Sequence, residues 1–256
     1  MPYNHPAQPS THSDFICTKP LKLSVNHLKT WDKCQRRFEL HSLRQLQWPS
    51  DPSNFVYGQS VHTLMDYQSR QLDCQPLLNS ADAKIRQAWD WLIQEETSQW
   101  PVIASEWGFT VPAPNHPLLK HVVLVGRIDR ISQGPDDSVV IVDWKTGTAI
   151  PKNPSTAWQT NVYLYAVYHS QKLLGLSGLT PEKLRFRYVS VNQGIKTVDI
   201  PYDDEAHTRV CQQLTHTLVN LVTATHYSLP PQCPDRFCAY QYVCGINAIN
   251  IEKQPL

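Results

Sequence analysis

The chain has 256 residues, 41% of them hydrophobic, and a formal net charge of +1 at pH 7. This length suffices for one sizeable core, and no apolar run approaches the ~20 residues of a transmembrane helix, so we expect a soluble protein with no membrane partner. The near-zero net charge says little for a nucleic-acid partner, because a strongly basic domain would have been the easier signal.

The N-terminal stretch is polar and rich in Pro, Ser and His, without the basic and then apolar order of a secretory signal. We expect residues 1–20 to form a disordered tail and residues 21–256 to form a single cytoplasmic domain. Within that domain we expect a helical region over residues 21–100, a sheet-containing core over residues 101–200, and a C-terminal helix with a cysteine segment over residues 201–256.

Three amphipathic helices are predicted before the first strand of the sheet. The first extends from Leu23 to Leu46 with Ser24 as its N-cap, the second from Tyr57 to Gln71, and the third from Ala81 to Gln99. The first helix has a local excess of basic side chains, which is compatible with a phosphate-binding face or with an ordinary solvated face. These basic residues are Lys22, Lys29, Lys33, Arg36, Arg37 and Arg44.

The middle of the chain is typical of a β-sheet. Residues 102–111 are a predicted strand, and residues 122–131 and 139–142 form two further strands joined by the turn sequence Gly-Pro-Asp-Asp. The sequence therefore predicts an antiparallel hairpin.

The chain after the hairpin predicts one more helix, two strands and a last helix. The first helix begins near Pro154 and Ser155 and continues to Leu174. The strands cover residues 184–190 and 195–200, and the last helix covers residues 203–223.

Charged residues converge at one end of the predicted hairpin. Asp143 and Lys145 are two apart in a strand and share a face, with Trp144 opposite and Asp129 on the neighbouring strand. Carboxylates are suitable ligands for Mg²⁺ or Mn²⁺, and a nearby lysine can hold or activate water for phosphodiester hydrolysis. The alternative for an isolated Asp-x-Lys is a salt-bridged strand end.

The hairpin resembles the PD-(D/E)xK nuclease superfamily, in particular RecB-type nuclease domains and the iron-sulfur exonucleases of CRISPR adaptation. The matching residues are Gly126, Asp129, Arg130, Ile131, Asp143, Lys145, Thr146 and Gly147. The resemblance implies an α/β fold with a mixed sheet, namely a restriction-endonuclease-like αβββαβ core with added N-terminal helices and a C-terminal cysteine segment.

The resemblance also implies site residues on the flanking helices. Gly58 and His62 match the family's G-x-x-x-H motif, whose histidine binds a metal, and Gln159 and Tyr163 match its Q-x-x-x-Y motif, which orients the lysine and the substrate. Glu106 occupies the place of a further acidic residue that could touch the metal. The implied metal ligands are His62, Asp129, Asp143, the Trp144 backbone carbonyl and Glu106. Taken singly, a helical histidine or glutamine is more often structural.

Cysteines cluster near the C-terminus, at Cys233, Cys238 and Cys244, in a chain with no export signal, which indicates metal or redox chemistry rather than disulfides. With Cys34 they supply four thiolates. The resemblance implies a [4Fe-4S] cluster held by one cysteine before the nuclease core and three after it. The sequence departs from the family pattern at Gln35, which replaces a proline, and at Cys233, because Asp235 occupies the expected cysteine position. Zinc binding, or loss of the cluster with retained cysteines, remains open. Cys17, Cys74 and Cys211 are expected to be incidental.

The implied function is that of a metal-dependent DNA nuclease that acts as an exonuclease or on single-stranded ends or flaps. DNA repair, recombination and CRISPR adaptation are the implied processes, with a helicase or CRISPR-adaptation proteins as candidate partners. The alternative is a catalytically inactive protein of the same fold that binds nucleic acid or serves as a structural subunit.

Overall fold

The computed structural model describes residues 19–47, 53–147, 150–192, 194–230, 233 and 238–245. The disordered tail predicted from the sequence falls almost wholly on residues 1–18, which lie outside the described residues. Cys17 lies there too. Within the described helices, none is long and apolar enough to cross a membrane.

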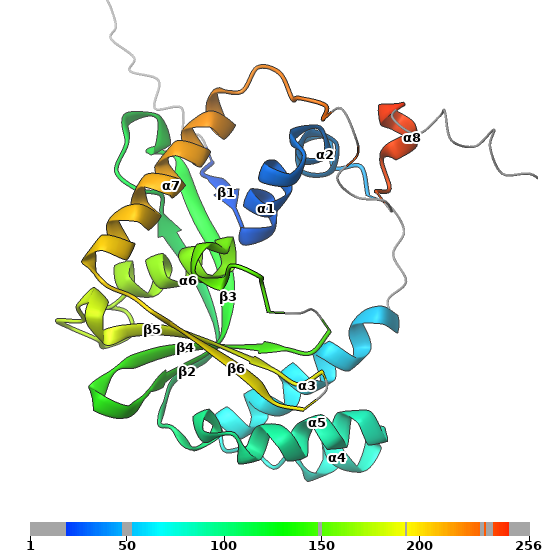
Figure 1. Ribbon diagram of the computed structural model, residues 1–256, viewed down its shortest axis with the longest axis vertical. Coiled ribbons are helices and arrows are strands. Elements are labelled where there is room, and N and C mark those ends of the chain that lie inside the picture. Colours follow the sequence, from blue (N-terminus) through cyan, green and yellow to red (C-terminus); the bar gives the residue numbers. More distant parts are fainter. Residues whose placement is uncertain are drawn as a thin grey trace, which may run out of the picture.

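The described residues form one six-stranded mixed sheet (Figure 1). Its strands are β1 (Leu21–Leu23), β2 (Val102–Pro112), β3 (Val122–Gln133), β4 (Val139–Lys145), β5 (Leu184–Ser190) and β6 (Lys196–Pro201). Antiparallel β2 pairs along one edge of β3, and the other edge is shared by antiparallel β4 and parallel β1. β4 then pairs in parallel with β5, and β5 pairs antiparallel with β6. The predicted hairpin is thus confirmed as β3 and β4.

Helices cover both faces of this sheet, with α6 and α7 on one side and α3 and α5 on the other (Figure 1). The helices are α1 (Val25–Lys33), α2 (Gln35–Phe38), α3 (Ser53–Ser69), α4 (Gln75–Ser80), α5 (Ala83–Gln94), α6 (Trp158–His169), α7 (Asp204–Thr223) and α8 (Gln241–Cys244). Short helical turns are η1 (Glu39–Leu43), η2 (Glu96–Gln99), η3 (Pro117–Leu119), η4 (Pro135–Asp137), η5 (Pro154–Thr156) and η6 (Pro181–Lys183). The predicted α/β class with a restriction-endonuclease-like core is confirmed.

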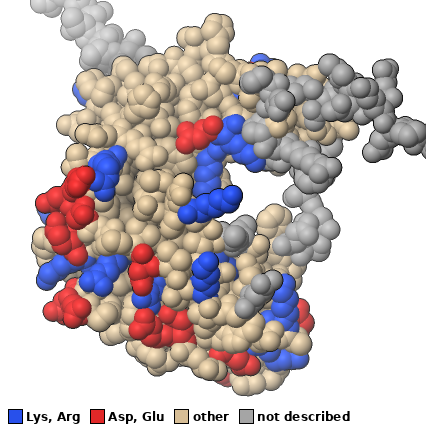
Figure 2. Space-filling view, viewed as in Figure 1, with Lys and Arg blue, Asp and Glu red and all other residues tan. Residues whose placement is uncertain are grey.

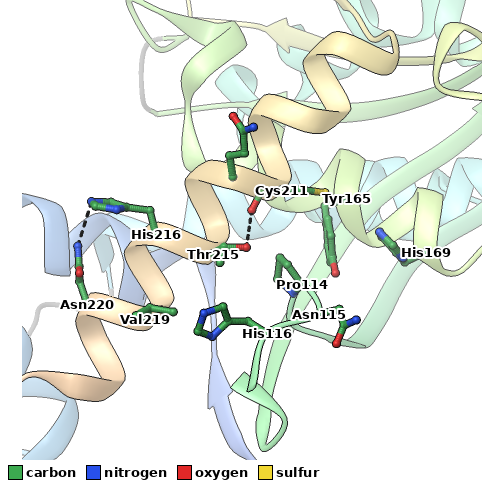
Figure 3. A pocket seen from close by; sticks show the side chains of 11 residues that line it. Pro114, Asn115, His116, Tyr165, His169, Cys211, Thr215, His216, Val219 and Asn220 are labelled. Carbon is green, nitrogen blue, oxygen red and sulfur yellow. Dashed lines mark hydrogen bonds between the residues drawn. The ribbon is translucent and has the colours of Figure 1, made fainter. Parts of the chain in front are cut away.

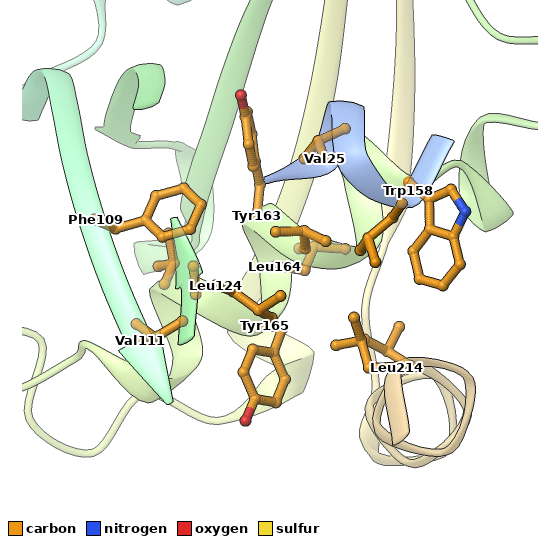
Figure 4. Packing of buried hydrophobic residues seen from close by; sticks show 14 of the residues in the cluster. Val25, Phe109, Val111, Leu124, Trp158, Tyr163, Leu164, Tyr165 and Leu214 are labelled. Atoms are coloured by element: carbon orange, nitrogen blue, oxygen red, sulfur yellow. The ribbon is translucent and has the colours of Figure 1, made fainter. Parts of the chain in front are cut away.

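Strand β4 is buried on both faces, which explains its unbroken apolar run. Ile141 packs into the cluster that includes α6 and α7, part of which Figure 4 shows. Val142 and Trp144 pack into the cluster formed with α3 and α5. Because side chains alternate along a strand, Asp143 and Lys145 face the α6 side. The predicted separation of these two residues from Trp144 is therefore confirmed.

The single helix predicted from Leu23 to Leu46 is wrong, because the helix breaks at Cys34. Cys34 has extended backbone angles (φ −166°, ψ 108°), and its sulfur accepts the N–H of Arg37, so it ends α1 and caps α2. Leu21–Leu23 forms strand β1 instead, since its backbone pairs with residues 122–124 of β3. This strand depends on a distant partner, so local patterning does not reveal it.

The other helix predictions are confirmed with shifted ends. The helix predicted over residues 81–99 is α5, which ends at Gln94, and the Glu95 carboxylate then accepts the N–H of Thr97 to begin the separate turn η2. The helix predicted to begin near Ser155 begins at Trp158, after the turn η5. α4 was not predicted. Asp203 caps α7 by accepting the N–H of Ala206.

Candidate active site

The two carboxylates predicted from the hairpin lie where β3 and β4 separate. Residues 130–133 pair with residues 139–142, while residues 122–124 of β3 pair with β1 on the same edge. The strands diverge beyond Arg130 and Val142. At that point the N–H of Trp144 donates to Asp129 Oδ2 at 3.0 Å. The space between the strands is thus filled by a side-chain carboxylate instead of a backbone acceptor.

Lys145 and Gln159 complete a hydrogen-bonded ring with Asp143. Lys145 Nζ lies 2.6 Å from Asp143 Oδ2 and donates to Gln159 Oε1 at 2.7 Å. Gln159 Nε2 in turn donates to Asp143 Oδ1. All three side chains therefore hold one another in place, and the amide of Gln159 has a fixed orientation.

Metal-ligating side chains surround this ring. His62 Nδ1 lies 3.4 Å from Asp129 Oδ2. Ligand atoms of His62, Glu106 and Asp129 all lie within 4.8 Å of one another, whereas Asp143 is not part of that close group. The structure thus brings Glu106 to the site, on a backbone with φ +47°, an uncommon conformation for a residue other than glycine.

This donor set fits a hard divalent cation. Carboxylate oxygens with one imidazole nitrogen are ligands that Mg²⁺ and Mn²⁺ accept. Asp143 Oδ2 is buried, with Lys145 Nζ 2.6 Å away. A carboxylate oxygen has two lone pairs. The one not directed at Lys145 is what a cation between Asp129 and Asp143 would use.

The electrostatics of the site favour added positive charge. Burial, together with the negative charge of Asp129, raises the pKa of Asp143 to about 7. Burial and the Asp129 charge likewise raise the pKa of Glu106. Burial lowers the pKa of His62, but its hydrogen bond to Asp129 and the nearby acidic groups outweigh burial and raise it. Burial is the largest cause of the raised pKa values of Asp143 and Glu106, and the charge of Asp129 adds to it, so a bound cation would favour the ionised carboxylates.

Arg130 and Gly58 determine how closely helix α3, which carries His62, lies against the strands. The Arg130 side chain is 1% exposed and donates to Ser132 Oγ at 2.8 Å, to Gln68 Oε1 at 2.9 Å and to the Trp100 carbonyl at 2.7 Å. A Cβ atom added at Gly58 would lie 2.9 Å from Thr146 Oγ1, which is too close for an undisturbed contact. The G-x-x-x-H glycine therefore permits α3 to approach the end of β4.

Helix α6 carries Gln159 and Tyr163 on the face toward the cleft. Trp158 Nε1 donates to Asp32 Oδ2 and so joins α6 to α1. Tyr163 is buried beside Phe109 and Phe186, with ring centroids 5.7 and 6.2 Å away. Burial and the charges of Asp143 and Asp129 raise its pKa, so the phenol stays protonated and can act as a hydrogen-bond donor.

These residues lie in a cleft of about 1070 Å³. Lys29, Phe55 and Arg127 also line it, and the sequence did not identify them as site residues. Arg127 is held by Glu106 at 2.8 Å. Lys29 belongs to the predicted basic stretch, and burial with the nearby Lys145 lowers its pKa. Figure 2 shows a hollow between the α1–α2 region and α3, with Lys and Arg side chains beside it.

The predicted basic face over the first helices is only partly present. Of its six residues, Lys29 lines the cleft. Arg36 and Arg44 instead form ion pairs with Glu39, which is buried. The charge excess in the sequence therefore overstated the positive surface that faces the cleft, because two of the cations neutralise a buried carboxylate.

The four cysteines predicted to act together lie in one neighbourhood. Cys238 packs with Leu40 and Tyr240, and Cys233 and Cys244 lie against the same cluster. Burial raises the pKa of the Cys244 thiol, and the nearby Cys34 and Cys233 raise it further. Burial likewise raises the pKa of Cys238, with Cys233 beside it. Cys233 thus lies with the others despite its irregular spacing.

Two solved structures are similar to this chain. A Eubacterium rectale crystal structure named "Putative exonuclease" aligns with a TM-score of 0.51 and 12% identity, covering 98% of this chain and 97% of that one, which supports the fold. A crystal structure of SSO0001 aligns with a TM-score of 0.39 and 14% identity, covering 77% of this chain and 75% of that one. No curated protein matches the sequence.

The family model of the PD-(D/E)XK nuclease superfamily matches residues 22–245. That span contains both carboxylate-bearing strands, the histidine helix before them and the glutamine helix after them. The predicted resemblance to the superfamily is confirmed, while its RecB-type and iron-sulfur branches remain predictions. The chain belongs to the PD-(D/E)XK nuclease superfamily.

Proposed function

We propose that this chain is a metal-dependent deoxyribonuclease that acts as an exonuclease or on single-stranded ends or flaps. The observation that supports this most strongly is the hydrogen-bonded ring of Asp143, Lys145 and Gln159 beside the ligand group of His62, Glu106 and Asp129. An ordinary salt-bridged strand end would explain the Asp143–Lys145 pair, but it would not explain three further metal-ligating side chains converging on the same place.

Asp129, Asp143, His62 and Glu106 would hold the cation. The N–H of Trp144 points at Asp129, and the N–H and C=O of one strand residue point to the same side, so the Trp144 carbonyl is also directed toward this gap. When bound, Mg²⁺ or Mn²⁺ supplies positive charge that offsets the charge developing on the scissile phosphate.

Lys145 acts on the attacking water and the phosphate. Its ammonium group uses one N–H for Gln159 and contacts Asp143, which leaves a further N–H for a water or a phosphate oxygen. In-line attack by that water forms a new P–O bond and releases one water proton to solvent, while the bond to the leaving deoxyribose oxygen breaks and that oxygen takes up a proton from solvent. We assign Lys145 to positioning and charge stabilisation, because an ion-paired ammonium is a donor and not a base.

The cleft supports a single-stranded substrate. Phe55, at the start of α3, lines the cleft and is 64% exposed. Aromatic faces stack on unpaired bases regardless of sequence. Lys29 lines the opposite wall from α1 and could contact a phosphate.

A direct test uses end-labelled oligonucleotides with Mg²⁺, Mn²⁺ or chelator. We expect wild type to degrade single strands and flaps only with a divalent ion, and Asp143→Asn to lose at least about 10²-fold in rate. Asp136→Asn is the matched control, since Asp136 is exposed in the hairpin turn. Equal rates for Asp143→Asn and wild type would refute the site. Salt-dependent binding with no cleavage would support the inactive nucleic-acid-binding alternative.

We further propose that Cys34, Cys233, Cys238 and Cys244 hold a [4Fe-4S] cluster. Their shared neighbourhood and thiol chemistry support this, and four thiolates suit either iron-sulfur or zinc. Anaerobic purification followed by iron, sulfide and zinc analysis distinguishes the two. About four irons and four sulfides per chain support the cluster, whereas stoichiometric zinc or no metal argues against it.

A further inference from the structure

A second cavity, of about 610 Å³, lies on the side of α6 that faces away from the catalytic cleft. Figure 4 shows Tyr163 and Tyr165 leaving α6 in opposite directions, and Tyr165 lines this second cavity. The remaining wall comes from α7 and from the loop after β2 that contains His116 (Figure 3). The proposed nuclease function makes no use of this cavity.

Three metal-ligating side chains converge at its edge. His169 is the last residue of α6, and His207 and Cys211 are one turn apart on α7. One ligand atom from each lies within 4.8 Å of the other two. Figure 3 shows Cys211 and His169 on either side of Tyr165, at the same end of the cavity. Residues on two helices thus present one sulfur and two nitrogens to one point.

The separation of Cys211 from His207 is close to that of two tetrahedral ligands. Zn–N bonds of about 2.0 Å and a Zn–S bond of about 2.3 Å at tetrahedral angles require an N···S separation of about 3.5 Å. Cys211 Sγ lies 3.6 Å from His207 Nε2. No large rearrangement of α7 is therefore needed for these two atoms to share an ion.

A supporting residue orients His207. Its Nδ1 lies 2.8 Å from the hydroxyl oxygen of buried Tyr202. In the tautomer that donates Nδ1–H to Tyr202, the Nε2 lone pair faces Cys211 and is free for a metal. A hydrogen bond from the second ring nitrogen is the usual way in which a metal-binding histidine is oriented.

Zinc binds the thiolate form of cysteine, so an ion that binds here must displace the Cys211 proton to solvent.

We propose that His169, His207 and Cys211 bind one Zn²⁺ ion, with water in the fourth position, and that this ion joins the end of α6 to the first turns of α7. A thiolate and two imidazoles select a borderline-soft cation, in contrast to the carboxylate-rich cleft. In this structure Cys211 contacts the His207 imidazole, and the His169 ring packs at a tilt against the Tyr165 ring, with centroids 4.1 Å apart. Cys211, expected from the sequence to be incidental, thereby gains a role.

The test counts zinc per chain in the full-length protein, after chelator treatment, re-addition of ZnCl₂ alone and desalting. We expect wild type to bind one equivalent more than each of His169→Gln, His207→Gln and Cys211→Ser. His216→Gln is the matched control on the same helix, because His216 lines the same cavity but pairs with Asn220 at 3.0 Å. It should retain the wild-type stoichiometry.

Two further measurements distinguish loss of this zinc site from misfolding and from zinc bound at the C-terminal cysteines. His169 is exposed, so His169→Gln should fold normally even if Cys211→Ser does not, and circular dichroism checks this. Cys238→Ser reports on zinc held by the C-terminal cysteines and should keep the equivalent that Cys211→Ser loses. The proposal is overturned if His169→Gln and His207→Gln bind as much zinc as wild type, or if the only equivalent lost is the one that Cys238→Ser removes.

Discussion

The candidate active site and the four-cysteine group differ in how the chain holds them. Asp143 and Lys145 are carried by β4, which pairs with β5 at both residues and has helices on both faces. Cys34 lies at a break between two short helices, and Cys238 and Cys244 lie in and around the four-residue helix α8. The first group inherits its geometry from the sheet, whereas the second relies on a small cluster around Leu40 and Tyr240.

This contrast predicts which substitutions should lower the cleavage rate and which should lower the stability of the fold. Side chains fixed by a buried sheet can be changed without moving the backbone, so their replacement should affect rate more than stability. Side chains that hold a peripheral segment should affect stability more than rate. The following predictions test that division.

The largest expected effect is on rate, from Lys145→Met. Loss of the ammonium group should lower the cleavage rate by about 10²- to 10³-fold, because the water and phosphate lose their donor. Metal binding should survive, since Lys145 is not a ligand. Single-turnover cleavage and Mn²⁺ titration measure the two properties, with exposed Lys172→Met as the control. Loss of Mn²⁺ binding together with rate would mean that Lys145 only supports the carboxylates.

Gln159→Leu should reduce the rate by a smaller factor, about 10- to 100-fold. The substitution keeps the side-chain size but removes both hydrogen bonds that hold Lys145 and Asp143 in the ring. Because Gln159 positions other groups, the reduction should appear in kcat more than in KM. An unchanged kcat would show that the strands alone fix the lysine.

The metal requirement should depend on pH. Since the pKa of Asp143 is raised to about 7, a proton competes with the cation below that value and is absent well above it. The Mn²⁺ concentration for half-maximal rate should therefore rise toward about tenfold per pH unit as pH falls from 7 to 6, and change little from 8 to 9. Initial rates across a Mn²⁺ series at each pH measure this, and a flat dependence below pH 7 would contradict it.

The smallest expected effect on rate comes from Cys238→Ser. Cys238 is 6% exposed in its cluster and is a proposed cluster ligand, so Cys238→Ser should lower the unfolding free energy by about 1–3 kcal/mol from the buried hydroxyl alone, and by more if a ligand is lost. Cleavage by the folded fraction should stay within about twofold of wild type. Thermal melting and active-fraction assays measure both, with Cys74→Ser as the control. Abolished cleavage in folded Cys238→Ser protein would contradict the idea that the cysteine group affects stability more than rate.

The sequence predicted the strand-borne part of the site well, because strand periodicity places Asp143 and Lys145 on one face without knowledge of the rest of the chain. It could not predict the break at Cys34, where a sulfur caps the next helix, or strand β1, whose partner is far away in sequence. Lys29 was visible as one of six cations, but only packing distinguishes it from those that pair with Glu39.

The convergence of His169, His207 and Cys211 could not be predicted from the sequence either, because it depends on the packing of two helices. His207 and Cys211 show helical spacing, but nothing local indicates that the end of α6 brings His169 beside them. Motif matching detects ligands whose spacing is shared with a family. Motif matching does not detect candidate ligands that are brought together only by the packing of one helix against another.

The buried side chain of Arg130 joins the two segments that carry the proposed cation ligands. His62 and Asp129 are far apart in the sequence, and Arg130, next to Asp129 in β3, donates to Gln68 on α3. Mg²⁺ tolerates little deviation from octahedral ligand distances, whereas larger cations tolerate more. For the proposed cation site we therefore expect Arg130→Met, which removes no proposed ligand, to shift the Mg²⁺-to-Mn²⁺ activity ratio toward Mn²⁺.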